Sequence, residues 1–367
     1  MISLNTLALK EALSKCGKCA KNDKTAPLTQ LINIKTVNEH TLSFTATDER
    51  NTFSYFLTDL TSNFDNIDIC VLIDQLTKLI SKFNCTNTQL VVSDTNNELS
   101  IIGDGDYKIS IPIDANGKPI EYPEIEDTAP VTEVYSGNIS NILAAAKFCE
   151  GSILKVTLDM QVEDYPRTNY FVGKDIISLD GFLATRVSGD FVNFDTLVSP
   201  STLKLLSLFT DEDFSMYKTK TYNVFKCSDC IMYTVEPEGL DAYPTEVASQ
   251  LIDSISGNTV DISAGVFVSA LNRLNLFTDD RSDNSIKIVF NDKGMFAYTI
   301  DGACVEQISS EPCKDFTCYI NVTSLISMLK AYSTDIIKLY YGDDRCFKFE
   351  FNNVGQIIVL SDFGDNQ

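Results

Sequence analysis

Apolar residues recur at helical spacing in six segments of this 367-residue chain. Residues three and four apart share one face of a helix, so such a run predicts a helix with one buried side. Asn138, Ser263, Asn321 and the pair Ser199-Pro200 are residue types that commonly begin helices. The predicted helices are residues 3–21, 71–84, 138–150, 199–211, 263–278 and 321–334.

Each helix is followed by short runs in which apolar and polar residues alternate, as in strands with one buried face. Turn-forming Asn, Asp and Gly residues separate the runs, which predicts antiparallel hairpins. The clearest examples are residues 88–113, 214–237 and 335–360. The predicted unit is therefore one helix followed by several antiparallel strands.

Six such units pair into three repeats of roughly 120 residues, a spacing that indicates a repeat architecture. Segments rich in Pro, Gly and acidic residues, 115–130 and 238–249, join the repeats. We therefore expect three domains, residues 1–125, 126–250 and 251–367. The expected fold class is α+β, with two helices of each domain packed on antiparallel sheets.

Three aspartates end strand patterns at equivalent places in the repeats: Asp48 after "TLSFTAT", Asp180 after "IISL" and Asp301 after "MFAYTI". A catalytic site needs different residues that converge on one point, whereas these three lie in three separate repeats. We expect a turn-forming or solvating role, because an aspartate side chain accepts hydrogen bonds from the backbone that follows it.

The composition indicates a globular protein of the cytoplasm. With 44% hydrophobic and 22% charged residues, the chain can fill two or three cores. It has neither an apolar run of ~18 residues nor the basic start and apolar core of a signal peptide, so no membrane association is expected. Eleven cysteines, an odd number, favour free thiols in a reducing compartment.

Charge is distributed unevenly along the chain. Its net charge is -22, yet the six predicted helices hold ten basic and only four acidic residues. Solvated helices usually carry both signs in similar numbers, so chance clustering is the weaker interpretation. Helices that line one surface would form a basic track inside an acidic shell, suited to binding phosphates.

Candidate chemical sites are few. Two C-x-x-C pairs, Cys16/Cys19 and Cys227/Cys230, invite a zinc or redox interpretation, but about 200 residues separate them, far more than in a zinc ribbon. His40 is the only histidine, and no phosphate-binding G-x-x-x-x-G-K-[ST] loop occurs. We therefore expect no enzyme activity, no metal and no cofactor.

The repeat pattern with basic helices resembles the beta subunit of bacterial DNA polymerase III, the replicative sliding clamp. Local stretches resemble that family in order along nearly the whole chain. They are "KTAPLTQLINIKTVNEHTLSFTATDE", "SILKVTL", "IISLDGFLA", "GLDAYP" and "DISAGVFVSALNRLNLFTDD". The resemblance implies a ring of domains, helices inside, that encircles duplex DNA and tethers a DNA polymerase. It also implies loading by an ATP-dependent clamp loader.

The resemblance places roles on particular residues. Expected DNA contacts come from the helices and the segment after the first one: Lys10, Lys15, Lys18, Lys21, Lys24, Lys78, Lys82, Lys147, Lys204, Arg273 and Lys330. A head-to-tail homodimer would join an edge strand with Tyr107, Ile109 and Ile111 to a region near Leu276 and Phe277.

A groove for a partner's apolar and aromatic peptide is also implied by the resemblance. Its matched positions are Leu154, Leu179, Gly181, Phe182, Pro244, Ile357, Val359 and Leu360. The family's His and Arg after "D-G" are replaced here by Phe182 and Leu183, unless Arg186 substitutes, and the family's final "M-P-M-R-L" is replaced by "VLSDFGDNQ". This divergence suggests a phage, plasmid or otherwise specialised clamp.

Two other functions remain open from the sequence. The first keeps the clamp fold but makes the protein a recruitment platform for transcription or repair proteins. The second is an acidic carbohydrate- or nucleotide-processing enzyme with a repeated α+β fold. The lack of converging histidines, acid pairs and phosphate loops argues against that enzyme.

Overall fold

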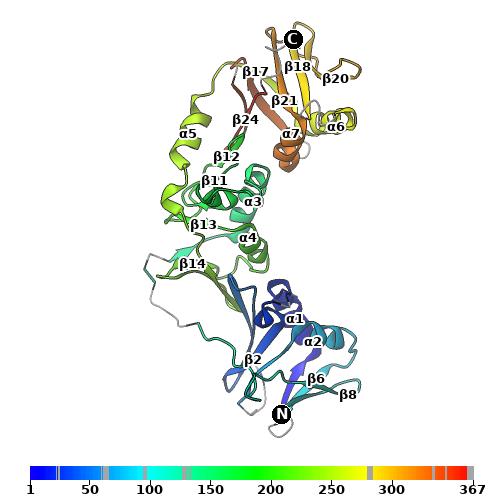
Figure 1. The fold of residues 1–367 in the computed structure, drawn as a ribbon, viewed down its shortest axis with the longest axis vertical. Coiled ribbons are helices and arrows are strands. Elements are labelled where there is room, and N and C mark those ends of the chain that lie inside the picture. The colour runs from blue at the N-terminus through cyan, green and yellow to red at the C-terminus, as the bar shows by residue number, and fades with distance from the viewer. Residues whose placement is uncertain are drawn as a thin grey trace. The chain divides into compact units, whose positions relative to one another are not determined.

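The structure is a computed structural model that describes residues 1–21, 23, 25–58, 60, 66–93, 97–125, 130–131, 134–278, 284–332, 335–343 and 345–361. Within these residues, one order of elements occurs three times: a strand, a helix, four strands, a second helix and three strands (Figure 1). The threefold repeat of helices and strands expected from the sequence is therefore present.

The bounds of the elements show how closely the repeats match. The first repeat comprises β1 (Ile2–Asn5), α1 (Thr6–Cys19), β2 (Leu31–Asn38), β3 (Thr41–Thr47), β4 (Asn51–Leu57), β5 (Asp68–Leu72), α2 (Ile73–Ser81), β6 (Asn87–Ser93), β7 (Glu98–Ile102) and β8 (Asp106–Ser110).

The second comprises β9 (Tyr135–Ser136), α3 (Ile139–Cys149), β10 (Tyr170–Val172), β11 (Ile176–Leu179), β12 (Leu183–Val187), β13 (Thr196–Val198), α4 (Pro200–Leu206), β14 (Ser215–Lys218), β15 (Tyr222–Lys226) and β16 (Cys230–Val235). The third comprises β17 (Asn258–Ser263), α6 (Ala264–Leu274), β18 (Ser285–Asn291), β19 (Gly294–Thr299), β20 (Val305–Ser309), β21 (Phe316–Asn321), α7 (Val322–Leu329), β22 (Ile336–Tyr341), β23 (Cys346–Phe351) and β24 (Val354–Val359).

All six predicted helices are confirmed, although each is shorter than its apolar pattern. Helix α1 begins after Asn5, whose Oδ1 accepts from Leu7 N at 2.9 Å and Ala8 N at 3.2 Å. Asn321 caps α7 in the same way through Ser324 N. These side chains satisfy backbone N–H groups that have no partner inside the helix, and so fix where each helix starts.

One helix was not predicted. Residues 238–249 were expected to join two repeats, and helix α5 (Thr245–Ser254) begins within this join. Its Ala248 and Ile252 are buried, so packing of one apolar face stabilises a helix whose short pattern lies next to Gly239 and Pro244.

Two eight-stranded sheets each join strands from two repeats. One has the order β5-β2-β3-β4-β16-β15-β14-β9, and the other has the order β13-β10-β11-β12-β24-β23-β22-β17. In each, an antiparallel ladder crosses from one repeat to the next, β4 with β16 and β12 with β24. Two four-stranded sheets remain, with the orders β1-β6-β7-β8 and β20-β19-β18-β21.

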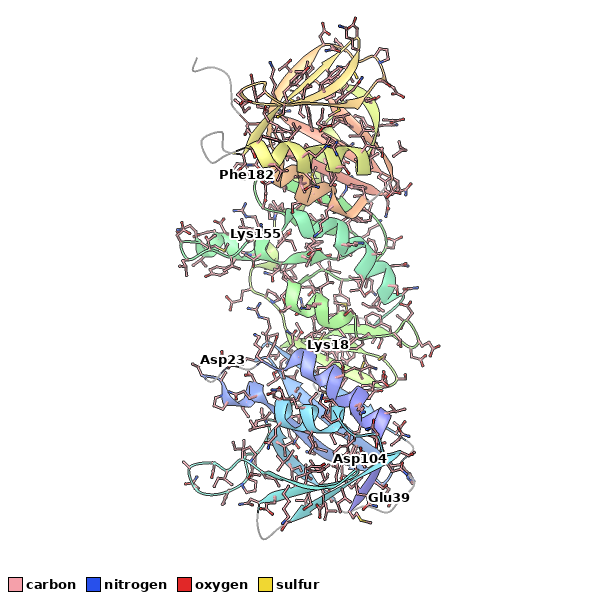
Figure 2. All side chains as sticks on the ribbon, turned by 90° about the vertical axis from the view of Figure 1, so that its right-hand side faces the viewer. Lys18, Asp23, Glu39, Asp104, Lys155 and Phe182 are labelled. Atoms are coloured by element: carbon pink, nitrogen blue, oxygen red, sulfur yellow. The ribbon has the colours of Figure 1, made fainter. Side chains whose placement is uncertain are left out.

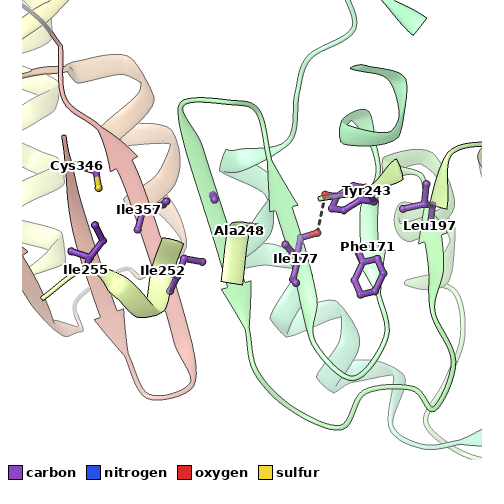
Figure 3. Packing of buried hydrophobic residues seen from close by; sticks show 10 residues of the cluster. Phe171, Ile177, Leu197, Tyr243, Ala248, Ile252, Ile255, Cys346 and Ile357 are labelled. Atoms are coloured by element: carbon purple, nitrogen blue, oxygen red, sulfur yellow. Dashed lines mark hydrogen bonds between the residues drawn. The ribbon is translucent and has the colours of Figure 1, made fainter. Parts of the chain in front are cut away.

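The chain divides into two compact units, residues 1–139 with 201–236 and residues 140–200 with 237–367. In the first, α1 packs on α2, β3 and β4; in the second, α6 contacts α7 and α5 lies on β11, β12 and β24. Figure 3 shows Ala248 and Ile252 of α5 in a cluster with Ile255, which follows the helix, and with Ile177 and Ile357. The division into domains 1–125, 126–250 and 251–367 stays a prediction.

None of the helices in the described ranges is both long enough and apolar enough to cross a lipid bilayer.

Candidate nucleic-acid and partner interfaces

The helices of the three repeats carry a clear excess of positive charge. Within their observed bounds, α1, α2, α3, α4, α6 and α7 hold seven basic residues and two acidic ones, Glu11 and Asp74. Helix α5, which lies between repeats, shows the opposite: Glu246 and Asp253 without any basic residue. The charge bias therefore follows the repeated helices and is not a property of every helix in this acidic chain.

Several of these basic side chains extend into solvent. Lys18 lies on the outward face of α1 (Figure 2), the face that also exposes Leu7, Glu11 and Ser14. Further exposed basic residues are Lys21, Lys78, Lys82, Lys147, Lys204, Arg273 and Lys330. Lys24 lies outside the described residues.

Other basic side chains are already bound within the first unit. Lys10 Nζ donates to Phe83 O at 2.7 Å, across the gap between α1 and the end of α2. Lys21 Nζ lies 3.3 Å from Asp48 O, and Lys78 pairs with Asp74 at 2.6 Å one helical turn away. These bonds hold the ammonium groups in place but leave Lys21 and Lys78 largely exposed.

Lys15 is largely enclosed, with 17% of its side chain exposed. Its Nζ lies 3.2 Å from Asp229 Oδ2, 3.1 Å from Glu11 Oε1 and 4.3 Å from the centre of the Tyr55 ring. Burial alone would lower the pKa of Lys15, but the hydrogen bonds to Glu11 and Asp229 outweigh it and raise the pKa above its usual value. Lys15 therefore connects α1 to the sheet as a permanent cation.

A hollow of about 340 Å³ lies between α1 and α2. Gly17, Ala20 and Lys21 border it on one side, and Asp74 and Thr77 on the other. The Thr77 hydroxyl is buried and has no hydrogen-bond partner among the described residues. The surface between the two helices is thus concave, with both apolar and polar groups, and Gly17 leaves it open because a Cβ there would meet nothing within 4 Å.

In the second unit, Arg273 of α6 is paired with a carboxylate. Its Nε and Nη2 donate to the two carboxylate oxygens of Glu306 at 2.7 and 2.9 Å, which ties α6 to β20. Arg273 therefore supports an edge strand, whereas Lys147 and Lys330 have no ion pair among the described residues.

The three repeated aspartates form turns, as predicted. Each Oδ1 accepts from the backbone N–H two residues later: Asp48 from Arg50, Asp180 from Phe182 and Asp301 from Ala303, at 2.8 to 3.0 Å. The residue between has a positive φ in every case, 78° at Glu49, 104° at Gly181 and 70° at Gly302. Burial raises the pKa of Asp180, whereas bonding to Thr299 lowers the pKa of Asp301.

The eight residues of the predicted groove all lie in the second unit. Gly181 and Phe182 form the turn between β11 and β12, and Val359 N donates to Phe182 O at 2.9 Å, so the end of β24 lies beside that turn. Phe182 is 70% exposed and Val359 38% exposed. Both are available to a partner, and Figure 2 labels Phe182.

The remaining groove residues lie at its edges or beneath it. Leu154, Leu179, Pro244 and Leu360 are half-buried, and Pro244 precedes α5. Ile357 is 2% exposed within the hydrophobic cluster, so it supports the surface from below instead of presenting a side chain to a peptide.

Sequence reasoning missed Arg167, which lies beside the groove turn. A Cβ on Gly181 would come within 3.2 Å of Arg167 Nη1, and Leu154 N donates to Arg167 O at 3.1 Å. Asp164, one turn earlier, pairs with the guanidinium. The only sequence signal was this acid three residues before the arginine in "EDYPRT". Arg186 does not act at this turn, because it donates two hydrogen bonds to Asp253 of α5.

The residues expected at a dimer contact differ in exposure: some are exposed and others are buried. Leu276 and Phe277 follow α6 and are 79% and 66% exposed, and Tyr107 on β8 is 41% exposed. Ile109 and Ile111 are buried in their own unit, so their side chains cannot meet a partner directly. Strand β8 nevertheless ends its sheet, so its backbone edge is the relevant feature there.

The two C-x-x-C pairs differ. Cys16 and Cys19 are buried on α1 and donate to separate carbonyls, Phe44 O and Ala46 O. Cys227, Asp229 and Cys230 form, among the described residues, one group whose ligand atoms lie within 4.8 Å of one another. His40 lies in an exposed turn, with Nδ1 3.0 Å from Leu60 O.

Comparison with known proteins places the fold. No protein-family model matches the chain, and no curated protein matches it. Among solved structures, the DNA polymerase III subunit beta from Pseudomonas aeruginosa has a TM-score of 0.84 at 13% identity, over 98% of this chain and 99% of that chain.

Two further solved structures agree. The beta chain from Streptococcus pneumoniae has a TM-score of 0.81 at 15% identity, over 98% of this chain and 100% of that chain. The beta subunit from Thermotoga maritima has a TM-score of 0.80 at 15% identity, over 99% of both chains. The resemblance drawn from the sequence is confirmed at the level of architecture, and this chain has the fold of bacterial DNA polymerase III beta subunits.

Proposed function

We propose that this protein is a DNA sliding clamp, a closed ring of two copies that encircles duplex DNA and tethers a DNA polymerase. The observation that carries the proposal is the way in which the repeats join. Each repeat contributes two groups of four hydrogen-bonded strands. In the first repeat these groups are β5-β2-β3-β4 and β1-β6-β7-β8, and the other two repeats have the equivalent groups.

The two joints inside the chain follow one rule. The edge strand β4 of the first repeat pairs with β16, the last strand of the second; β12 of the second pairs with β24, the last strand of the third. The rule leaves β20 of the third repeat and β8 of the first as edges of their sheets. A third joint of the same kind would pair β20 of one copy with β8 of another.

Such a contact is head-to-tail, and two copies with three repeats each would close it into a ring of six repeats. Open sheet edges otherwise invite aggregation, so covering both edges is a gain for the folded protein. Leu276 and Phe277 lie after α6, which Arg273 ties to β20 through Glu306. These exposed apolar side chains would be buried beside the joint.

The existing joints also predict the register of the third. Phe53 lies opposite Met232 in one joint, and Thr185 lies opposite Gln356 in the other. The residue that precedes each helix gives a common starting point, from which the paired residues of neighbouring strands can be followed to the edge of the sheet. In this way Cys304 on the edge of the third repeat is equivalent to Phe53 and Thr185, and Tyr107 is equivalent to Met232 and Gln356. We therefore expect Tyr107 of one copy opposite Cys304 of the next.

The helices supply the proposed DNA surface. Lysine side chains attract phosphates without reading bases, and a surface of exchangeable phosphate contacts lets a ring move along the duplex. The residues best placed for this role are exposed and make no ion pair within the described ranges: Lys18, Lys82, Lys147, Lys204 and Lys330. Lys10, Lys15, Lys21, Lys24, Lys78 and Arg273 remain proposed contacts, with Lys15 and Arg273 already engaged by carboxylates.

Partners would bind the groove beside Phe182 and Val359 with an apolar or aromatic peptide. We propose a DNA polymerase as the main client and an ATP-dependent loader to open the ring, in the cytoplasm. Chemistry would be carried out by these partners, and the clamp would need neither metal nor cofactor for its role. A clamp-fold platform for transcription or repair proteins is the alternative, favoured if clients other than a polymerase occupy this groove.

Light scattering on the purified chain tests the assembly. We expect the mass of a dimer at micromolar concentration, and a monomer for the Leu276→Asp, Phe277→Asp double variant, since charged groups would replace the apolar side chains of the joint while the cores stay intact. The Val156→Asp, Val162→Asp variant changes equally exposed residues of the same unit and should remain a dimer. Only monomer from the unaltered chain would refute the proposed ring.

A further inference from the structure

We propose that Cys227 and Cys230 form a redox-active dithiol that a small-molecule disulfide converts into an intramolecular disulfide bond. The two sulfur atoms lie 2.8 Å apart at the turn between β15 and β16. Their residues flank a two-residue turn of Ser228 and Asp229, and Cys227 N donates to Cys230 O at 2.9 Å. This inference does not rest on the proposed clamp function.

The backbone already has the spacing that a disulfide needs. Opposite residues that share such a hydrogen bond in an antiparallel pair have Cα atoms about 5.5 Å apart. Disulfides in proteins usually join Cα atoms about 4.4 to 6.8 Å apart. The bond can therefore form by rotation of the two side chains, without displacement of the hairpin.

The two thiols have distinct surroundings that suit the two steps of thiol–disulfide exchange. The two sulfurs share a hydrogen bond in which either can be the donor, and Cys227 Sγ also donates to Asp229 Oδ1 at 3.0 Å. The contact with Cys230 lowers the pKa of Cys227, while the same contact and burial raise the pKa of Cys230. Cys227 is 3% exposed next to exposed Ser228, and Cys230 is fully buried. Cys227 is thus the attacking thiolate, and Cys230 resolves the intermediate.

The exchange is balanced with a disulfide such as oxidised glutathione. The Cys227 thiolate attacks one glutathione sulfur, which forms a mixed disulfide and releases the other half as a thiolate. That thiolate takes the Cys230 proton, and the Cys230 sulfur then attacks the Cys227 sulfur and expels the second glutathione. The second glutathione leaves as a thiolate and takes up the proton that Cys227 lost on ionisation. The protein thus loses two electrons and two protons, and the oxidant becomes two thiols.

A metal site is the competing interpretation of the same cluster, because Asp229 adds a carboxylate. Two sulfurs bound tetrahedrally to one zinc ion at about 2.3 Å would lie about 3.8 Å apart, farther than the sulfurs here. In addition, the Lys15 ammonium lies 3.2 Å from Asp229 Oδ2 and would repel a cation. Both observations favour the dithiol over a metal.

The Cys16/Cys19 pair is an internal control with the same spacing. Cys16 Sγ donates to Phe44 O at 3.1 Å, and Cys19 Sγ lies 3.4 Å from Asn51 O, so each thiol on α1 is directed to a carbonyl. Burial raises the pKa of both, to about 12 for Cys19, so neither forms a thiolate readily. This pair should stay reduced where Cys227 and Cys230 react.

The test equilibrates the native protein in buffers from fully reduced to fully oxidised glutathione, alkylates the remaining thiols and maps them by mass spectrometry. We expect the peptide with Cys227 and Cys230 to lose two hydrogen atoms and to escape alkylation, while Cys16 and Cys19 stay thiols. The Cys230→Ser variant should stop at the Cys227–glutathione mixed disulfide. Free thiols at both Cys227 and Cys230 in the most oxidising buffer would overturn the proposal. Zinc bound in a one-to-one ratio, and lost in the Cys227→Ser variant, would overturn it as well. The first result comes from the unaltered protein and so does not depend on the folding of a variant.

Discussion

Basic side chains on the helices fall into two kinds that the sequence alone could not distinguish. Lys15 directs its charge to Asp229, in the turn between β15 and β16, and Arg273 directs its charge to Glu306 on β20. Lys18 and Lys82 extend into solvent without an ion pair among the described residues. Only the second kind has its full charge available for a phosphate, since a paired lysine must first give up its partner.

Charge reversal of Lys18 and Lys82 tests this distinction. The Lys18→Glu, Lys82→Glu variant should bind duplex DNA more weakly, and its plot of log affinity against log salt should flatten by about 0.9 for each phosphate that the variant no longer neutralises. Fluorescence anisotropy over a salt series measures both. Lys174→Glu with Lys293→Glu alters exposed lysines outside the helices and should change little; equal effects from both pairs would remove the helices from the DNA surface.

Glu49 is strained at a position where the other two repeats have glycine. Its φ of 78° is in the left-handed region, and the equivalent residues Gly181 and Gly302 adopt that region without a Cβ. The left-handed conformation costs a non-glycine residue about 1 to 2 kcal/mol. We expect Glu49→Gly to raise the free energy of unfolding by about 1 kcal/mol in urea denaturation. Arg50→Gly, one residue later, should not stabilise the chain; a gain from both would point to a cause other than φ.

The Arg186–Asp253 pair should make stability depend on pH. Hydrogen bonds from Arg186 lower the pKa of Asp253 below 3.8, so the pair stabilises the fold above that pH and loses its effect as the pH falls through the folded-state pKa. Because Asp253 is 60% exposed, Asp253→Asn should cost less than about 1 kcal/mol at neutral pH. Urea unfolding at several pH values should show the difference vanish in acid, and a difference that persisted there would exclude the pair as its source.

At the scale of elements, the sequence predicted the repeated helices because each has several apolar residues at helical spacing. It failed for α5, whose pattern is short and follows Gly239 and Pro244, signals of a loop. Only tertiary packing of Ile252 and Ala248 on β12 and β24 makes that segment helical. The pairs Lys15–Asp229 and Arg273–Glu306 could not be predicted from the sequence either, because the two partners of each pair lie far apart along the chain.

The packing of α5 on β24 has a specific fit. A Cβ on Gly355 would lie 2.8 Å from Ile252 Cγ2, so Gly355→Ala should overpack the site and cost about 1 to 3 kcal/mol of unfolding free energy. Ile252→Ala should cost about 2 to 5 kcal/mol through the cavity that it leaves. Chemical denaturation of the double variant should show a loss smaller than the sum, because the new methyl group enters that cavity.

Gly17→Ala in α1 is the control for the Gly355→Ala variant, because it adds the same methyl group at a position without close neighbours. Nothing lies within 4 Å of a Cβ at Gly17, so alanine should stabilise the helix by about 0.5 to 1 kcal/mol. Strict additivity of Gly355→Ala and Ile252→Ala would contradict the close approach of α5 to β24.

At the scale of the whole molecule, the repeat of elements was predictable while the order of strands was not. Periodicity identifies each helix and strand, but the pairing of β4 with β16 and of β12 with β24 joins residues far apart in sequence. Solved structures with the same fold share only 13 to 15% sequence identity with this chain. Very different sequences can therefore adopt the same order of strands, and the sequence alone does not reveal that order. The partner edges β8 and β20 follow only once these joints are known.

The central claim, a ring closed around DNA, can be tested without a loader. The Tyr107→Cys variant would place a thiol opposite the native Cys304 of the neighbouring copy at both joints. Dilute variant would be mixed with circular duplex DNA, concentrated and treated with a short bis-maleimide, then examined in SDS. The same variant with Cys304→Ser cannot be joined there and serves as the control.

We predict a crosslinked dimer that stays with the circular DNA in SDS and is released by a single restriction cut, because only topology holds it once the detergent has unfolded it. The Cys304→Ser control should leave the circle in SDS. A crosslinked dimer that never remains on the circle, or one that remains equally on linear DNA, would contradict the ring.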